Sequence, residues 1–453
     1  MLNYIWLGLI LSAVIIGGCT DSLKAVAEKS FEMAETSVMK IALPLVGIMA
    51  IWLGIMRLAE RSGLVSLLAR VLRPVMRFLF PDVPAEHPAM GSMLMNIAAN
   101  MLGLNNAATP LGLRAMKDLE SLNPRPGTAT NAMCTFLALN TGSVQLIPAT
   151  AIAILAAAKS TNPTAIVGTS LMSTACAAVA AVTAAKVLAR LPVFRLTAVS
   201  EATRSAGSSK PEEVSAAANK PAVKEAATLQ PLSAWGSLWL GAFGLFFVYL
   251  FLRMAFPALV GRPVPADLAT QSAFVRIINA VSLLSIPFML SVFPLYAMLR
   301  RVKVYEEFVD GAKEGFDVAL KIIPYLVAIL VAIGMFRAAG GIDLLSRVLK
   351  PAMLAVGFPS DLLPLVLLRP LSGSGSLGLF SELVQHFGPD SFVARTAGTI
   401  YGSTETTFYV LAVYFGAVGI KKTRYAVLAG LTADTVGVIA SVIICRIVFG
   451  GGQ

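Results

Sequence analysis

Long apolar stretches separated by short polar ones dominate this chain, in the pattern of a membrane protein. Apolar runs that approach the length needed to cross a bilayer occupy residues 6–19, 41–56, 166–188, 235–254, 277–299 and 428–448. We predict a helix for each run, because a segment in hydrocarbon must satisfy its own backbone hydrogen bonds. With the broken segments described next, the pattern predicts an all-α polytopic membrane protein of about ten membrane elements.

Two apolar regions are interrupted by polar residues, one in each half of the chain. Residues 139–151 read LNTGSVQLIPATA, and residues 397–416 read AGTIYGSTETTFYVLAVYFG. Amide, hydroxyl and carboxyl groups at membrane depth usually face a cavity and mark a site. We therefore predict broken helices that bind a ligand through Asn140, Thr141, Ser143, Gln145, Ser403, Thr404, Glu405, Thr406 and Thr407. The alternative is that these groups only pack helices together, as small and polar residues do in membrane bundles.

Two further segments combine residues that break helices with polar side chains. Residues 96–113 hold four asparagines, two glycines and a proline, which predicts a broken helix or hairpin. Its candidate ligand-binding residues are Asn100, Asn105, Asn106 and Thr109, unless the segment is a loop outside the membrane. Residues 369–379 read RPLSGSGSLGL and predict a re-entrant tip that brings Ser372, Ser374 and Ser376 to a cavity. Arg369 either counters an anionic group or anchors to lipid headgroups.

Two acidic residues stand out in apolar surroundings. Glu405 is the first candidate, because its hydroxyl-bearing neighbours can hydrogen-bond the carboxyl in either protonation state. Such a group can carry a proton, help to bind a cation, or accept a hydrogen bond from a substrate. Asp434, in the last apolar stretch, is the second candidate. The alternative is that both acids lie at helix ends in water. H⁺ or Na⁺ is the candidate coupling ion, and no cofactor is expected.

The chain contains an internal repeat. Residues 66–76 read SLLARVLRPVM and residues 343–353 read DLLSRVLKPAM, with seven of eleven positions identical. Arg70 and Arg73 alternate with leucines and valine in the first copy, which predicts a short amphipathic helix that Pro74 ends, either at the membrane interface or packed between membrane spans. Residues 197–230 are rich in Ala, Ser, Lys, Glu and Pro and are typical of a disordered cytoplasmic linker. We therefore predict two homologous membrane halves, residues 1–196 and 231–453, on either side of this linker.

Composition and charge narrow the functional classes. Hydrophobic residues make up 57% of the chain and charged residues 13%, about half the charged share of soluble domains. The net charge of +11 fits basic cytoplasmic loops. Basic residues lie at segment ends without interleaved aromatics, so no nucleic-acid partner is expected. Four scattered cysteines and two histidines argue against a metal site. No nucleophile lies near a histidine and no acids are paired, so we expect no enzyme.

Several motifs resemble those of two known families. Residues 100–110 (NMLGLNNAATP) and 139–148 (LNTGSVQLIP) resemble spore maturation protein A. Residues 369–378, 388–392 and 402–422 resemble spore maturation protein B, so the chain looks like a fusion of the two. Both families carry the nucleoside-recognition, or gate, domain, which is related to concentrative nucleoside transporters. The resemblance implies a transporter-like helical fold with re-entrant hairpins, but it does not establish nucleosides as the substrate.

The sequence thus favours a transporter in the bacterial inner membrane. The substrate would be a small polar solute, nucleoside-like or another metabolite, bound between the two halves. The alternative is a membrane scaffold for envelope or spore-cortex maturation that transports nothing and uses its polar segments for helix packing. The expected partners are the solute and the lipid bilayer, and self-association into a homo-oligomer stays open.

Overall fold

The computed structural model describes residues 2–194, 231–269, 271–341, 344 and 358–450. The predicted linker, residues 197–230, and nearly all of the second repeat copy, residues 343–353, lie outside the described residues. Over the described part the regular structure is helical, and one isolated β-bridge pairs Thr128 with Lys422. The prediction of an all-α fold is confirmed.

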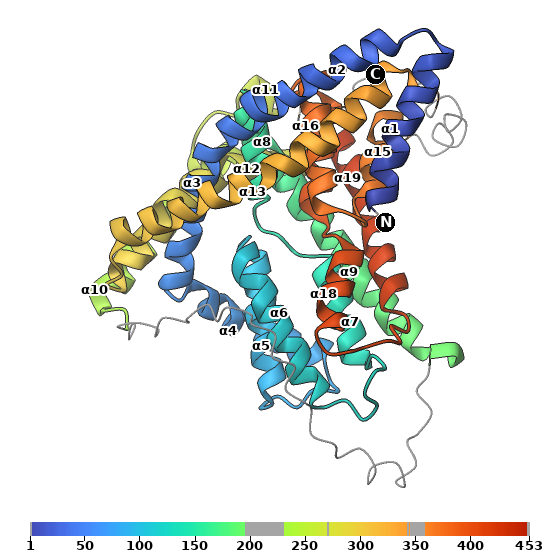
Figure 1. The fold of residues 1–453 in the computed structure, drawn as a ribbon. Coiled ribbons are helices and arrows are strands. Elements are labelled where there is room, and N and C mark those ends of the chain that lie inside the picture. The colour runs from blue at the N-terminus through green and yellow to red at the C-terminus, as the bar shows by residue number, and fades with distance from the viewer. Residues whose placement is uncertain (1, 195–230, 270, 342–343, 345–357, 451–453) are drawn as a thin grey trace.

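The helices of the first half are joined mostly by short connections (Figure 1). They are α1 (Leu2–Cys19), α2 (Leu23–Glu35), a π-helical turn (Thr36–Ala42), α3 (Leu43–Arg61), α4 (Leu64–Leu79), α5 (Pro88–Met101), α6 (Asn105–Glu120), α7 (Asn131–Thr141), α8 (Ala149–Ala157) and α9 (Ile166–Arg190). The second half holds α10 (Ala234–Ala255), α11 (Ala266–Ala269), α12 (Ala273–Leu299), α13 (Val304–Ala338), α15 (Leu363–Leu368), α16 (Gly373–Phe387), α17 (Phe392–Ser403), α18 (Thr407–Gly416) and α19 (Ala426–Phe449).

The apolar runs in the sequence all lie within helices. Among the described residues, five helical stretches are long and apolar enough to cross a membrane: Leu23–Arg61, Pro163–Arg190, Ala234–Ala255, Ala273–Leu299 and Ala426–Phe449. The helices on either side of the predicted breaks, α7 and α8 and then α17 and α18, are each about half that length. The chain is therefore a multi-pass membrane protein with broken helices between full-length spans.

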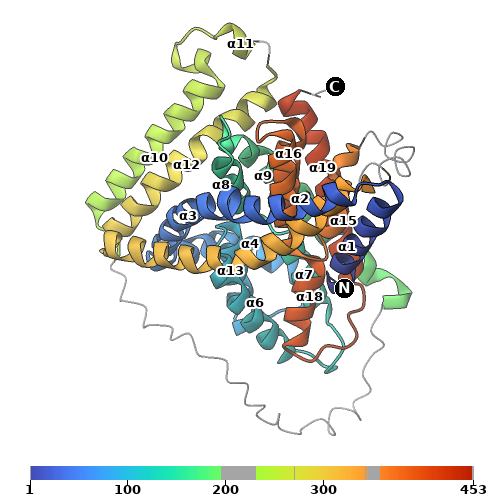
Figure 2. The same cartoon turned by 45° about the horizontal axis from the view of Figure 1, so that its top comes forward.

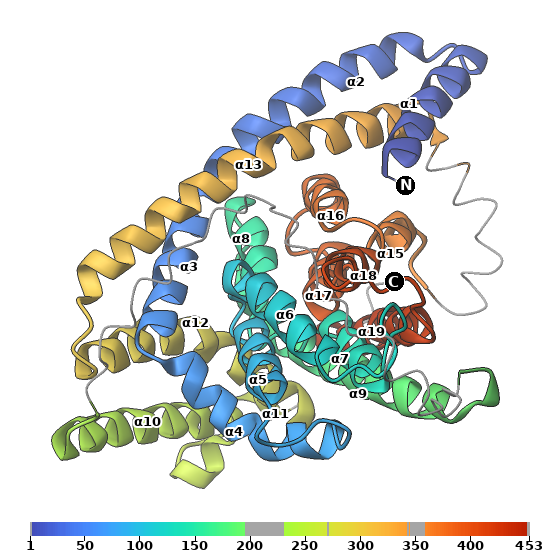
Figure 3. The ribbon, with the colours of Figure 1, turned by 60° about the horizontal axis from the view of Figure 1, so that its bottom comes forward.

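The longest helix, α13, packs antiparallel to the continuous helical stretch Leu23–Arg61, which contains α2 and α3. α13 runs beside α2 and α3 along one edge of the molecule (Figure 3). Glycines on α13 permit this approach, because a Cβ atom at Gly315 would lie 2.6 Å from the Cα atom of Ala50. Arg57 on α3 donates to Glu307 at 2.9 Å and to Glu314 at 2.5 Å. These ion pairs join the two halves of the chain near one end of the helix pair.

A hairpin of α10 and α12 lies on the opposite side of the molecule from α15 and α19 (Figure 2). α10 contacts α12 over its length but is otherwise covered little by protein. Its exposed side chains are large and apolar, among them Trp235, Leu238, Trp239 and Leu245. Such a surface is typical of a helix that faces lipid.

The two broken helices occupy equivalent places in an inverted arrangement. α7 and α17 begin with the same cap: the hydroxyl of Thr130 accepts from the N–H of Met133, and that of Ser391 accepts from the N–H of Ala394. α7 packs against α18, α8 packs against α17, and the following spans α9 and α19 pack against each other. The first piece of each broken helix thus lies beside the second piece of the other. The equivalent helices run in opposite directions, which is an inverted repeat.

At one end of this arrangement, the loop after α8 is hydrogen-bonded to the loop before α17. The Asp390 carboxylate accepts hydrogen bonds from the hydroxyl of Ser160 at 2.6 Å and from the N–H and hydroxyl of Thr161, both at 2.9 Å. Arg395 donates to the same carboxylate at 3.2 Å. Burial raises the pKa of Asp390, but these donors outweigh burial and hold its pKa below the usual range.

The prediction that Pro74 ends the amphipathic helix is wrong. α4 continues through Pro74 to Leu79. A proline removes one backbone hydrogen bond and costs about 3 kcal/mol in a helix interior. Met76 and Phe80, beyond the proline, are almost fully buried. Burial of two such side chains recovers about 3–6 kcal/mol, so packing outweighs the local cost.

Candidate functional site

The two helix breaks meet at the centre of the inverted repeat. α7 ends at Thr141 and α17 ends at Ser403, and the chain is unwound on the C-terminal side of both residues. The backbone N–H of Glu405 donates to the carbonyl oxygen of Thr141 at 2.8 Å. The side-chain amide of Gln145 donates to the Glu405 carboxylate at 3.2 Å. The two polar interruptions found in the sequence therefore contact each other across the halves.

Arg369 binds the backbone of the second helix break, between α17 and α18. Its side chain is only 4% exposed, although it carries a charge. Its guanidinium donates to the carbonyl oxygens of Tyr401, at 3.0 Å, and Thr404, and to the hydroxyl of Thr406 at 3.3 Å. The same guanidinium lies 4.7 Å from the centre of the Tyr401 ring and 4.0 Å from the Glu405 carboxylate. The backbone carbonyls that lack a helical partner at this break therefore accept hydrogen bonds from the buried guanidinium of Arg369.

A polar cavity of about 90 Å³ lies between the breaks, and Gln145, Arg369, Tyr401 and Glu405 contribute to its wall. The first turn of α8, Ala149–Ala151, and the first residue of α16 also line it. The start of a helix presents free N–H groups and the positive end of its dipole, which favours an anion. Arg369 adds a full positive charge, and its buried Nε atom has no hydrogen-bond partner. This wall suits a small anionic group.

Asp434 lies on the other side of Arg369. Its Oδ2 atom accepts from the hydroxyl of Thr407 at 2.6 Å, while its buried Oδ1 atom has no partner. A second cavity of about 220 Å³, mostly apolar, is lined by Arg369, Asp434 and Thr435 among others. Arg369 therefore lines both cavities, with one acid on each side. In the part of the chain that the structure describes, no three His, Cys, Asp or Glu side chains are grouped to hold a metal ion.

The predicted asparagines of the first half form a network apart from the polar cavity. Asn100 donates to the side-chain oxygen of Asn140 at 2.9 Å, and the hydroxyl of Tyr414 donates to the same oxygen at 3.4 Å. Asn96 in turn donates to the Tyr414 hydroxyl at 3.2 Å. This chain of amides fastens the α5–α6 pair to α7 and α18. The arrangement supports a packing role for Asn100 and Asn140.

Four of the ten predicted hydroxyl groups bond within their own helices or cap them. Thr141, Ser376 and Ser403 donate to backbone carbonyls three or four residues earlier, as in many membrane helices. Ser372 caps α16 by accepting from the N–H of Gly375, and Ser374 lies 3.4 Å from it. The hydroxyls of Ser143 and Thr404 are buried without a partner. Thr109 is half-buried on α6.

Two of the predicted residues, Gln145 and Glu405, line the polar cavity, and Asp434 lines the adjoining one. Asn105 and Asn106 open α6, but their side chains lie outside the described part. Arg369 did not enter the predicted set, and its burial excludes an anchor in lipid headgroups. An arginine in an otherwise apolar run was the available signal. Tyr401 was missed, because aromatic residues are common in any membrane helix.

Comparisons with known proteins agree with this architecture. The family model described as nucleoside recognition (Gate) matches residues 42–190 and 319–421, more than half of the chain. These two ranges contain both broken helices. No solved structure matches this chain.

Two relatives each cover about two fifths of the chain. Spore maturation protein B of Bacillus subtilis (strain 168) is 50% identical over 175 residues, which are 39% of this chain and 98% of that protein. Spore maturation protein A of the same strain is 42% identical over 182 residues, 40% of this chain and 92% of that protein. The inner membrane protein YjiG of Escherichia coli (strain K12) is 29% identical over 84 residues, 18% of this chain and 55% of that protein.

Proposed function

We propose that this chain, which belongs to the nucleoside-recognition (Gate) family and joins homologues of spore maturation proteins A and B in one polypeptide, is a transporter of the bacterial inner membrane. Its solute would present a small, polar, anionic group to the site between the helix breaks. The observation that carries the proposal is the buried Arg369 beside Glu405, between two helix breaks from opposite halves. Broken helices around a central site are the usual substrate site of inverted-repeat transporters.

The charge of the solute follows from the cavity wall. A fully buried guanidinium is costly to desolvate, and four groups of the protein already partner Arg369. Its Nε atom has no partner, and two helix N-termini line the same cavity as Arg369. A carboxylate or phosphate group of the solute would accept from these donors. A cation would meet the positive ends of the same helices.

Glu405 supplies a coupling device in this proposal. Its side chain is 31% exposed and competes with an anionic solute for Arg369. Protonation of Glu405 removes that competition, so a proton and an anion would bind together. Asp434, on the other side of Arg369, offers a second acceptor for the proton or for the guanidinium. H⁺ is therefore the coupling ion that we propose.

A membrane scaffold is the competing function, and one observation favours it. The hydroxyls of Thr141, Ser376 and Ser403 are buried and bonded within helices, as packing residues are. A scaffold needs no water at the helix breaks, whereas a transporter must admit water there from at least one side. Solvent access at the breaks therefore separates the two functions.

Cysteine labelling in intact membrane vesicles measures this access. Cys19 and Cys176 are exposed and are first replaced by serine. Gln145→Cys is the test variant, and Ser376→Cys, whose side chain is fully buried, is the matched control. The proposal predicts that a water-soluble maleimide labels Gln145→Cys and spares Ser376→Cys. Equal silence at both positions favours the scaffold.

A further inference from the structure

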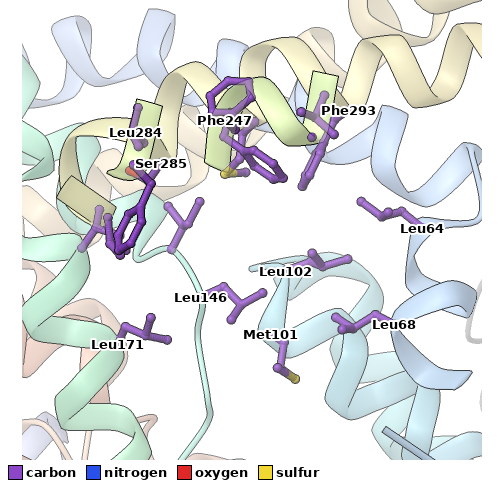
Figure 4. A pocket seen from close by; sticks show the side chains of 18 of the residues that line it. Leu64, Leu68, Met101, Leu102, Leu146, Leu171, Phe247, Leu284, Ser285 and Phe293 are labelled. Atoms are coloured by element: carbon purple, nitrogen blue, oxygen red, sulfur yellow. The ribbon is translucent and has the colours of Figure 1, made fainter. Parts of the chain in front are cut away.

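An apolar cavity lies beside the polar one. It has a volume of about 640 Å³, within the range of ligand pockets. In Figure 4, Met101, Leu102 and Leu146 lie on one side of it, and Phe247, Leu284 and Phe293 lie on the other. Of its lining side chains, Ser285 alone carries a polar group. Water has almost no partners in such a space, whereas hydrocarbon does.

The position of this cavity places it at hydrocarbon depth. One wall is formed by the middle of α10, around Gly244 and Phe247, and by the middle of α12, around Ser285. Both helices are long and apolar enough to cross the membrane. The apolar molecules available between the middles of two spans are lipid chains. The occupant must therefore carry a hydrocarbon chain.

The apolar and polar cavities share a wall. Ile147, in the unwound segment after α7, lines both of them. At the end of α5, Leu102 lines the apolar cavity and the next residue, Gly103, lines the polar one. A single layer of residues thus separates a hydrocarbon space from the donors around Arg369. This layer lies in the unwound segment between α7 and α8 and in the turn between α5 and α6, so it is built from backbone outside regular helix.

We infer that the solute is an anionic membrane lipid with a small head, which binds its phosphate or carboxylate at Arg369 and its hydrocarbon chain in the apolar cavity. This inference rests on the proposed function and names its substrate class. The polar cavity, at about 90 Å³, has room for a phosphate-sized head but not for a nucleoside. The hydrocarbon chain of the lipid would enter from the lipid side, between α4 and the α10–α12 hairpin. The head would then reach the polar cavity past Ile147.

Photochemical crosslinking with matched variants tests this inference. The probe is hexadecyl phosphate with a photoreactive diazirine in mid-chain, added to the full chain in lipid nanodiscs. Fatty acid of equal length, the corresponding alcohol and methyl phosphate are the comparison ligands. We expect crosslinks to the cavity-facing parts of α10 and α12, and we expect the hexadecyl phosphate and fatty acid to compete while the alcohol does not.

Two glycines of α10 allow matched substitutions, one of which fills the apolar cavity while the other leaves it open. An added Cβ atom meets nothing within 4 Å at either Gly244 or Gly241, so a side chain can begin at both positions without a clash. Gly244 lines the apolar cavity, whereas Gly241 is exposed and does not line it. Gly244→Phe should abolish crosslinking inside the cavity, and Gly241→Phe should leave it unchanged. Ser285→Phe is a second cavity-filling variant.

The head is tested through Arg369. Loss of a charge-assisted hydrogen bond should weaken competition by hexadecyl phosphate about tenfold or more in Arg369→Gln, with no effect on the alcohol. The inference would be overturned if the crosslinking were the same for every head group and were changed by neither Gly244→Phe nor Arg369→Gln. Such a result is what ordinary contact with bulk lipid would give. If methyl phosphate alone stabilises the protein through Arg369, the transport proposal stands and the lipid inference fails. If no anion of any chain length depends on Arg369, both fail.

Discussion

Replacement of Arg369 by methionine should be among the most destabilising single changes in the protein. The change keeps a flexible side chain but removes every donor. Two carbonyl oxygens and a hydroxyl in the second helix break then lose their partner in a buried environment. Hydrogen bonds to charged groups contribute about 1.5–3 kcal/mol each, and breaking a buried charged network costs about 3–5 kcal/mol.

The contribution of Glu405 to this loss is much smaller. Its carboxylate lies 4.0 Å from the guanidinium and is 31% exposed, and pairs of that kind contribute about 1 kcal/mol or less. We therefore expect Arg369→Met to lower the free energy of unfolding by about 3–5 kcal/mol. Arg369→Gln should lose roughly half as much, because its amide can still serve one carbonyl.

Equilibrium unfolding in mixed micelles of mild and denaturing detergent, followed by helical circular dichroism, measures these differences. The control is the double variant Arg369→Met with Glu405→Gln, which removes any uncompensated carboxylate. The double variant should regain about 1 kcal/mol or less. Full recovery in the double variant would refute the reasoning, because the role of Arg369 would then be to neutralise Glu405. An Arg369→Met variant with the same free energy of unfolding as the wild type would refute it as well.

Three other changes have defined outcomes. Gly315→Leu should destabilise the protein by about 1–3 kcal/mol in the same unfolding assay, because its Cβ atom meets the α3 backbone, whereas Gly47→Leu has open space and should not destabilise the protein; equal effects would contradict the close packing of α3 and α13. Asp390 has a lowered pKa in the fold, so its contribution to stability is present above its unfolded pKa of about 3.9 and lost as the pH falls toward its folded pKa. Melting temperature against pH should therefore fall less steeply below pH ~4 in Asp390→Asn than in the wild type; parallel curves would exclude this carboxylate as a source of acid sensitivity. Glu405→Gln should abolish proton-coupled uptake into proteoliposomes while retaining solute binding, detected as a saturable rise in melting temperature across a panel of nucleosides, nucleotides, amino acids and lipid phosphates; full uptake by this variant would remove Glu405 from the mechanism.

The elements that depend on local pattern could be predicted from the sequence. Apolar runs must form helices in hydrocarbon, and all of them do. The two polar interruptions had to be satisfied by something other than lipid, and they meet each other at Gln145 and Glu405. The Thr130 and Ser391 caps, which mark equivalent helix starts, were not predicted, although a hydroxyl residue before an apolar stretch is the signal that could have found them.

The features that depend on distant contacts could not be predicted. Whether Arg369 lay at a headgroup or at the centre was undecided, because that depends on how α15 enters the fold. Asn140 and Gln145 looked alike in sequence, yet one lies in a packing network and the other lines the polar cavity. Pro74 would have ended an isolated helix, and the burial of Met76 and Phe80 beyond it explains why α4 continues. The apolar cavity leaves no signal, because its lining has the composition of any membrane helix.

The central claim is that the two helix breaks form a water-accessible site selective for anions. It is tested most directly by the rates at which anionic and cationic thiol reagents of equal size modify Gln145→Cys. Arg369 and two helix N-termini line the same cavity, so the anionic reagent should react faster, by a factor on the order of ten. Arg369→Gln should remove most of that preference. Equal rates, a faster cationic reagent, or a preference that survives Arg369→Gln would contradict the account.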